Sequence, residues 1–193
     1  IFLGFIIFPF ILYLLKLNEQ ESPRFFFVYG LLFSFGYFFS SLYWISYSLN
    51  FDPEVAILKP FAILILPLAL SIFYGIGFYI FKRFFKFNFF FVFNFSILMA
   101  LTEYIRSFIT GFSWNLFVYA LNEQLASIQI LNIIGTFSLN LLTIFIFSFP
   151  YFLIKKNKIT LLKRLTLLIF LVGINYLYGL DRLKTNLEIK NQQ

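Results

Sequence analysis

The sequence predicts an all-α, polytopic transmembrane helix bundle of about six spans. Of its 193 residues, 61% are hydrophobic and 12% are charged, and the mean hydropathy is +0.90. A soluble domain of this length does not need so much apolar surface. Apolar runs of roughly the 20 residues that one crossing requires alternate with short polar breaks. The runs lie at 1–17, 24–48, 57–81, 88–110, 128–154 and 160–180.

Each of the first three breaks has residues that end a span. They are, in order, Asn18, Glu19, Glu21 and Pro23, then Asp52 and Pro53, then the cations Lys82, Arg83 and Lys86. Prolines also fall inside three runs, as Pro9, Pro67 and Pro150. Because proline lacks an N–H and its ring clashes with the preceding turn, we expect kinks there, which helix bundles in membranes tolerate.

The basic residues predict the orientation of the spans, since cytoplasmic loops carry an excess of Lys and Arg. Ten of the 15 fall on one side of the alternating spans: Lys16, Arg24, Lys82, Arg83, Lys86, Lys155, Lys156, Lys158, Lys163 and Arg164. The other five are Lys59, Arg106, Arg182, Lys184 and Lys190. We therefore expect the first set to be cytoplasmic, and loops 49–56 and 111–127 and the C-terminal tail to face the periplasm of a bacterium.

Composition also limits the possible chemistry. The net charge of +7 comes from short basic clusters between apolar runs, where membrane topology explains them, so we expect no nucleic-acid partner. The chain has no Cys and no His, which removes the thiol nucleophile, the imidazole base and Cys/His metal sites. We expect neither a metal nor a cofactor.

Two opposite charges near the end of the run 88–110 call for an explanation. Glu103 and Arg106 are three residues apart, on one side of a helix, and charges at membrane depth are costly. Arg106 extending outward to neutralise Glu103 would simply fix helix packing. Alternatively, the pair faces a pocket of lipid-headgroup size, with Arg106 available to a phosphate and Glu103 to an amine. The residues alone leave both interpretations open.

Aromatic residues flank this pair at the same predicted boundary. Gly111 should stop the helix, and Phe112 and Trp114 follow it, which is typical of a re-entrant or interfacial loop or of a plain aromatic anchor. Tyr43 and Trp44 allow the same anchoring role. Farther along, three polar residues around Gly135 predict hydrogen bonds between helices: Asn132, Ser138 and Asn140.

The order of these motifs resembles the N-terminal membrane domain of bacterial apolipoprotein N-acyltransferases. In that family a Ser-Pro-Arg opens a span that ends near Tyr-Trp, as 22–24 and 43–44 do here. A Glu-aromatic-x-Arg-Gly stretch and a Thr-Gly-Phe-Pro-Trp follow, similar to 103–107 and 110–114, and 135–142 resembles a third family motif. The chain departs from the family at Ser107 for Gly, Ser113 for Pro and Phe137-Ser138 for Tyr-Gly.

The resemblance implies a division of the chain and a reaction. Residues 1–180 would be the transmembrane domain without the family's first span, and 181–193 the start of a truncated periplasmic segment. The family's enzymes, in the bacterial inner membrane, transfer an acyl chain from a phospholipid to the N-terminal cysteine amine of a diacylglyceryl-modified apolipoprotein. The acyl chain passes through a thioester on a nitrilase-like domain with a Glu-Lys-Cys triad. This chain would have no catalytic residue and would be inactive alone.

We accordingly expect five residues to line a lipid site at the outer leaflet: Glu103, Arg106, Trp114, Tyr43 and Trp44. Gly111, Phe112 and Gly135 are expected to be structural. The main alternative is a small multi-pass transporter or channel with Glu103 and Arg106 as its intramembrane site. Against it, both charges lie near one surface and no inverted repeat is visible. A purely structural membrane subunit is the third interpretation.

Overall fold

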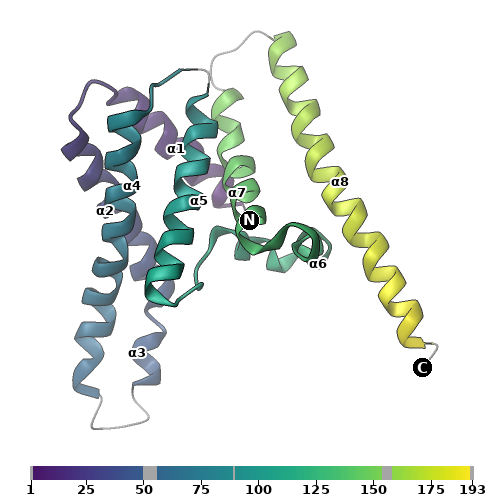
Figure 1. The fold of residues 1–193 in the computed structure, drawn as a ribbon, viewed down its shortest axis with the longest axis horizontal. Coiled ribbons are helices and arrows are strands. Elements are labelled where there is room, and N and C mark those ends of the chain that lie inside the picture. Colours follow the sequence, from purple (N-terminus) through teal and green to yellow (C-terminus); the bar gives the residue numbers. More distant parts are fainter. Residues whose placement is uncertain (1, 50–55, 89, 154–157, 192–193) are drawn as a thin grey trace. The chain divides into compact units, whose positions relative to one another are not determined.

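The computed structural model describes residues 2–49, 56–88, 90–153 and 158–191, and every regular element within these ranges is a helix (Figure 1). This confirms the all-α prediction. Five helical stretches of the described residues are long and apolar enough to cross a membrane. The chain divides into two compact units, Leu15–Asn115 and Ile1–Leu14 with Leu116–Gln193. Predicted loop residues 50–55 and the cations Lys155 and Lys156 lie outside the described residues.

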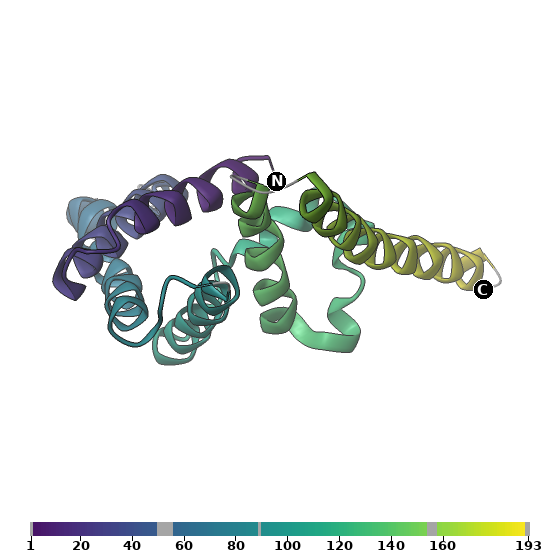
Figure 2. The ribbon, with the colours of Figure 1, turned by 90° about the horizontal axis from the view of Figure 1, so that it is seen from above.

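The unit Leu15–Asn115 is built from α2 (Pro23–Leu42), α3 (Ile45–Ser48), α4 (Leu66–Phe84) and α5 (Phe91–Thr110). Helices α2 and α4 run side by side (Figure 1), and α5 packs beside α4 (Figure 2). Gly30 permits this close approach, since a Cβ there would lie 2.6 Å from the Phe78 ring and 2.7 Å from the Tyr74 carbonyl oxygen. Small residues play this part where helices meet in membranes.

Aromatic rings fill the space between these helices. Phe38 of α2 meets Tyr74 of α4 edge-on, with ring centroids 5.5 Å apart. Phe78 and Phe81 of α4 each meet Phe95 of α5 edge-on at 5.7 Å. Edge-to-face contacts of this kind add to the gain from burying the rings. Part of the unusual content of 33 phenylalanines therefore forms the core of this unit.

The helix ends of this unit differ from the predicted runs in two places. The predicted span 24–48 is two helices, because the chain turns at Tyr43 and Trp44 between α2 and α3. The predicted span 57–81 extends over Ala56–Phe84, with a π-helical stretch at Phe61–Ile65 just before Pro67. Proline has no N–H to continue an α-helical ladder, which explains the irregular turn that precedes it.

The second unit contains α1 (Gly4–Leu17), the 3₁₀ helix η3 (Phe117–Glu123), α6 (Leu125–Ile128), α7 (Leu131–Ser148), the 3₁₀ helix η4 (Phe149–Leu153) and α8 (Lys158–Asn191). The last turn of α1, from Leu15, belongs to the first unit. Phe8 of α1 meets Phe117 edge-on, with centroids 4.9 Å apart, and Phe5 meets Phe147 at 5.0 Å. Of the predicted kinks, the one at Pro150 has a counterpart here, because α7 passes into a 3₁₀ helix that contains Pro150, whereas Pro9 lies within the continuous helix α1.

Two predicted boundaries in this unit were wrong. The predicted span 128–154 begins instead with α6, a turn and then α7, which is kinked at Gly135 (φ 75°, ψ 167°). The last helix does not end at 180 but continues to Asn191. The polar residues after Asp181 include good helix formers, and no Gly or Pro interrupts them, so loss of hydrophobicity alone does not stop the helix.

Candidate functional site

The polar centre of the unit Leu15–Asn115 is Arg106, near the C-terminal end of α5. The helix ends at Gly111, which has the left-handed conformation (φ 69°) of a helix C-cap, and the chain then turns back over the last turn. Nη1 of Arg106 donates to the carbonyl oxygen of Phe112 at 3.1 Å, and Nη2 donates to that of Trp114 at 3.0 Å. The side chain is thereby buried, with 1% of its surface exposed.

The remaining nitrogen of the guanidinium, Nε, is buried without a hydrogen-bond partner. The guanidinium carbon lies 5.4 Å from the centroid of the Phe38 ring, a cation–π distance. An orphaned donor on a buried cation is costly, and buried polar groups normally have a partner. Nε of Arg106 is therefore a donor whose hydrogen-bonding capacity is not used by the described residues.

A cavity of about 310 Å³ lies directly beside Arg106. Its walls come from the ends of α2, α4 and α5, from the start of α3 and from the loop after α5: Phe38, Leu42, Trp44, Ile45, Leu66, Leu70, Arg106, Phe112, Trp114 and Asn115. Apart from Arg106 and Asn115 these side chains are apolar or aromatic. Trp44 and Trp114 are half exposed at its rim, with ring centroids 6.1 Å apart. The cavity thus combines apolar walls with one cation, as ligand sites commonly do.

Helix α2 holds the loop 111–115 in place. The Tyr37 hydroxyl donates to the carbonyl oxygen of Asn115 at 2.8 Å, and Nδ2 of Asn115 donates to Oγ of Ser41 at 2.6 Å. Asn115 itself has a positive φ of 54°, which Asn tolerates better than most residues. Sequence reasoning missed these three residues. The available signal was the i, i+4 spacing of Tyr37 and Ser41, which places both on one face of an apolar helix.

The predicted site residues are only partly brought together. Arg106, Trp114, Trp44 and Phe112 border the cavity. Glu103 does not line it: this carboxylate is fully buried and accepts a hydrogen bond from the Tyr74 hydroxyl at Oε1, 2.8 Å away. Tyr43 is exposed and packs against Tyr47 of the next turn, with centroids 6.0 Å apart. Gly135 belongs to the other unit.

The other unit has its own cavity, of about 330 Å³, between α1, η3, α6, α7 and α8. Its lining is mostly aliphatic and aromatic, and no predicted site residue contributes to it among those described. The predicted hydrogen bonds between helices are confirmed nearby for two residues. Oδ1 of Asn140 accepts from the backbone N–H of Val118 at 2.9 Å, and that of Asn132 accepts from the Tyr178 hydroxyl at 3.2 Å.

Comparison with known proteins places this sequence in a family. Residues 1–149 match the family described as the apolipoprotein N-acyltransferase N-terminal domain. The chain is 38% identical over 127 residues to an apolipoprotein N-acyltransferase of Rhodopseudomonas palustris, covering 65% of this chain and 24% of the relative. For the protein of that name from Rickettsia typhi the identity is 34% over 173 residues, covering 88% of this chain and 34% of the relative.

A third relative, the apolipoprotein N-acyltransferase of Rhizobium etli, is 36% identical over 126 residues, or 64% of this chain and 24% of the relative. The chain thus spans about a quarter to a third of the length of these relatives. No solved structure matches the chain. The shared name of the relatives does not favour the transporter or channel alternative. The match over 1–149 shows that the chain belongs to the apolipoprotein N-acyltransferase N-terminal domain family.

Proposed function

We propose that this chain is the membrane domain of an enzyme that acylates the N-terminus of lipoproteins. In the proposed reaction a thiolate attacks the ester carbonyl of a phospholipid, a lysophospholipid leaves, and a thioester forms. The free α-amine of a diacylglyceryl-modified cysteine then attacks the thioester, which forms an amide and releases the thiol. Family membership over 1–149 is the support for this assignment.

The nucleophile of this reaction must come from outside these residues, because the chain contains no cysteine. We propose that a nitrilase-like domain with a Glu-Lys-Cys triad supplies it and that residues 1–193 alone are inactive. The contribution of the membrane domain would be to bind and orient the phospholipid donor and the lipid-modified acceptor. Positioning of this kind speeds a reaction without any chemical participation.

We place lipid binding at the cavity beside Arg106. Its volume of about 310 Å³ is at the lower end of the range for ligand sites, roughly 300–1,000 Å³, which suits a segment of one acyl chain rather than a whole lipid. The apolar walls favour a hydrocarbon chain, and the positive charge of Arg106, which lines the cavity, favours the ester or phosphate end of a lipid. Trp44 and Trp114 at the rim have the amphipathic rings typical of a membrane interface.

The topology that we propose puts this cavity at the periplasmic side of the bacterial inner membrane. Arg106 and the loop 111–115 lie at one end of the unit, whereas Lys16, Lys82, Arg83 and Lys86 lie at the other. The basic end would be cytoplasmic by the positive-inside rule. Lipoprotein N-termini exposed at the outer surface would then reach the cavity side of the domain.

Replacement of Arg106 in a complete acyltransferase that carries this segment tests the proposal. We expect Arg106→Ala to lower the rate of acylation of a diacylglyceryl lipopeptide at least about tenfold, because a charge-assisted contact is worth about 1.5–3 kcal/mol. The matched control is Arg24→Ala, which removes an exposed arginine at the opposite end of α2 and should keep the normal rate. Full activity of Arg106→Ala at normal membrane abundance would remove Arg106 from the site.

A further inference from the structure

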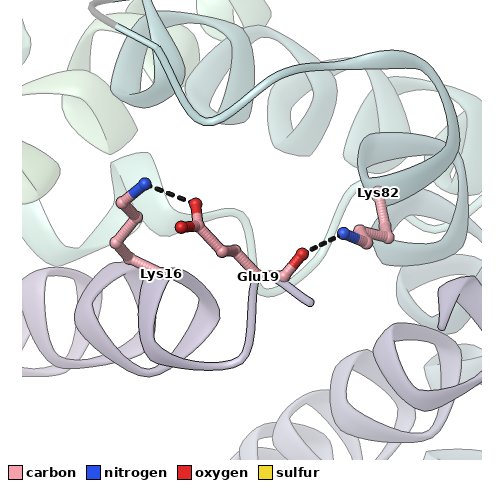
Figure 3. Close-up of polar contacts among 3 residues, drawn as sticks. All are labelled: Lys16, Glu19 and Lys82. Carbon is pink, nitrogen blue, oxygen red and sulfur yellow. Dashed lines mark hydrogen bonds and ion pairs between the residues drawn. The ribbon is translucent and has the colours of Figure 1, made fainter. Parts of the chain in front are cut away.

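A second polar cluster lies at the other end of the unit Leu15–Asn115, where α1 and α4 end and α2 and α5 begin. Glu19 stands between two lysines: its carboxylate pairs with the ammonium of Lys16, and its backbone carbonyl accepts from the ammonium of Lys82 (Figure 3). The two ammonium groups also lie 5.6 Å and 5.5 Å from the centroid of the Phe87 ring. These contacts fix the position of both lysines before any ligand arrives.

An open hollow of about 500 Å³ adjoins this cluster. Unlike the cavity beside Arg106, it is lined mainly by polar groups, on the residues Glu19, Gln20, Lys82, Arg83, Phe84, Phe85, Lys86, Phe87 and Asn88. Three of these are cations, and Glu19 is the one carboxylate among the lining residues that the structure describes. Since Lys16 already pairs with that carboxylate, the hollow has an excess of positive charge.

The position of the hollow, at the ends of the spans, favours a lipid headgroup as the anion that it binds. It lies where spans end, hence at the level of lipid headgroups, and the nearby rings of Phe84 and Phe90 are 72% and 58% exposed. Exposed rings beside a basic hollow offer apolar surface to acyl chains and cations to the phosphate. Basic pockets between transmembrane helices on the cytoplasmic side are known to bind anionic headgroups.

We propose that this hollow binds the phosphate of an anionic phospholipid. Lys82, already oriented by Glu19, would make one contact with the phosphate, and the exposed side chains of Arg83 and Lys86 would make the others. Arg83 is exposed beside Phe84, its guanidinium carbon 5.7 Å from the ring centroid, and Lys86 is exposed as well. Both side chains therefore reach a headgroup without breaking a contact that holds the fold. The site is separate from the cavity beside Arg106 and does not depend on the function proposed for it.

Lipid retention by the purified 193-residue chain tests this proposal. The chain is placed in nanodiscs of phosphatidylcholine with a minor fraction of phosphatidylglycerol, and the lipids that it retains on release are counted by native mass spectrometry. We expect phosphatidylglycerol to be enriched over its bulk fraction. Arg83→Gln/Lys86→Gln should reduce that enrichment more than about tenfold, since each basic residue near an anionic surface contributes roughly a fivefold preference.

The matched control is Lys59→Gln/Lys184→Gln, which removes the same charge at two residues that do not line the hollow and should leave the enrichment intact. A charge-retaining variant, Arg83→Lys/Lys86→Arg, should bind as the unchanged protein does, which separates loss of the phosphate contact from misfolding. Equal retention by the two Gln double variants, or no preference over phosphatidylcholine, would overturn the proposal. Displacement of the retained lipid by millimolar inorganic phosphate would instead assign the hollow to free phosphate and overturn the lipid assignment.

Discussion

Nη2 of Arg106 donates a hydrogen bond to the carbonyl oxygen of Trp114, 3.0 Å away, and this contact joins the buried cation to the aromatic rim of the cavity. Nη1 makes the equivalent contact with Phe112. One guanidinium thus closes the turn that follows α5. The loop after Gly111 is therefore ordered by a side chain from the helix that it leaves, and this loop carries Trp114, whose ring packs against Trp44.

Arg106→Lys should destabilise the domain although it keeps the charge. A lysine ammonium is a point donor and does not reproduce the planar fork that reaches both carbonyls. The loss of one buried hydrogen bond costs about 1–3 kcal/mol, so we expect a lower apparent Tm in detergent. Arg24→Lys, at an exposed position, should leave the Tm unchanged. An equal Tm for the two variants would contradict the bridging role of Arg106.

Acyl chains that enter the cavity should quench the intrinsic fluorescence of the protein. Trp44 and Trp114 are its two tryptophans and both line the cavity, so the emission reports on this site. We expect phospholipids brominated on the acyl chain to quench it. Leu70→Phe places a larger side chain in the cavity wall, which narrows the cavity and should weaken the quenching. Leu68→Phe, on an exposed face of α4, should not weaken it. Similar quenching in both variants would mean that lipid reaches the rings without entering the cavity.

The stabilities of three glycine-to-alanine variants should rank according to the backbone conformation at each glycine alone. At Gly36, Gly111 and Gly135 an added Cβ would lie more than 4 Å from any described atom beyond the adjoining backbone, so none of the changes causes a tertiary clash. Gly111→Ala should cost about 1–2 kcal/mol for its left-handed φ of 69°. Gly135→Ala should cost about as much or more, because φ 75° with ψ 167° is a conformation nearly restricted to glycine.

Gly36→Ala lies inside α2 at an ordinary helical φ and is the control for this series. It should stabilise the protein by about 0.5–1 kcal/mol, because alanine loses less backbone entropy in a helix. Thermal unfolding of the three variants in one detergent gives the order. A destabilised Gly36→Ala variant would show that this face of α2 has a packing partner.

Tyr74→Phe should destabilise the unit Leu15–Asn115 through Glu103. The Tyr74 hydroxyl donates to Oε1 of that fully buried carboxylate, and a buried acceptor that loses a donor costs about 1–3 kcal/mol. A double-mutant cycle with Glu103→Gln measures how much of the cost belongs to this pair. Tyr43→Phe, which alters an exposed hydroxyl, should be nearly neutral. If the stability effects of Tyr74→Phe and Glu103→Gln are additive, the hydrogen bond between these side chains contributes no coupling free energy to folding.

Much of the fold was predictable from local patterns. Runs of apolar residues located the membrane-spanning helices, because the bilayer thickness sets their length. Gly111 marked the end of α5, and Pro67 and Pro150 marked irregular stretches, because glycine allows a left-handed backbone and proline cannot donate to the helical ladder. The predicted boundaries were wrong at the break between α2 and α3 and at the end of α8. Hydrophobicity alone does not reveal a turn inside an apolar run, and it does not reveal that a helix continues into a polar segment.

The sequence by itself determined that this is a helical membrane domain of a recognisable family and that Glu103 and Arg106 lie on one side of a helix near its end. Only the tertiary structure decided what each charge does there. Tyr74, from another helix, donates to Glu103, whereas Arg106 donates to carbonyl oxygens of the loop that Tyr37 holds at Asn115. Spacing along the chain settles which face of a helix a residue occupies, but the partner on that face comes from helix packing, which brings together residues far apart in sequence.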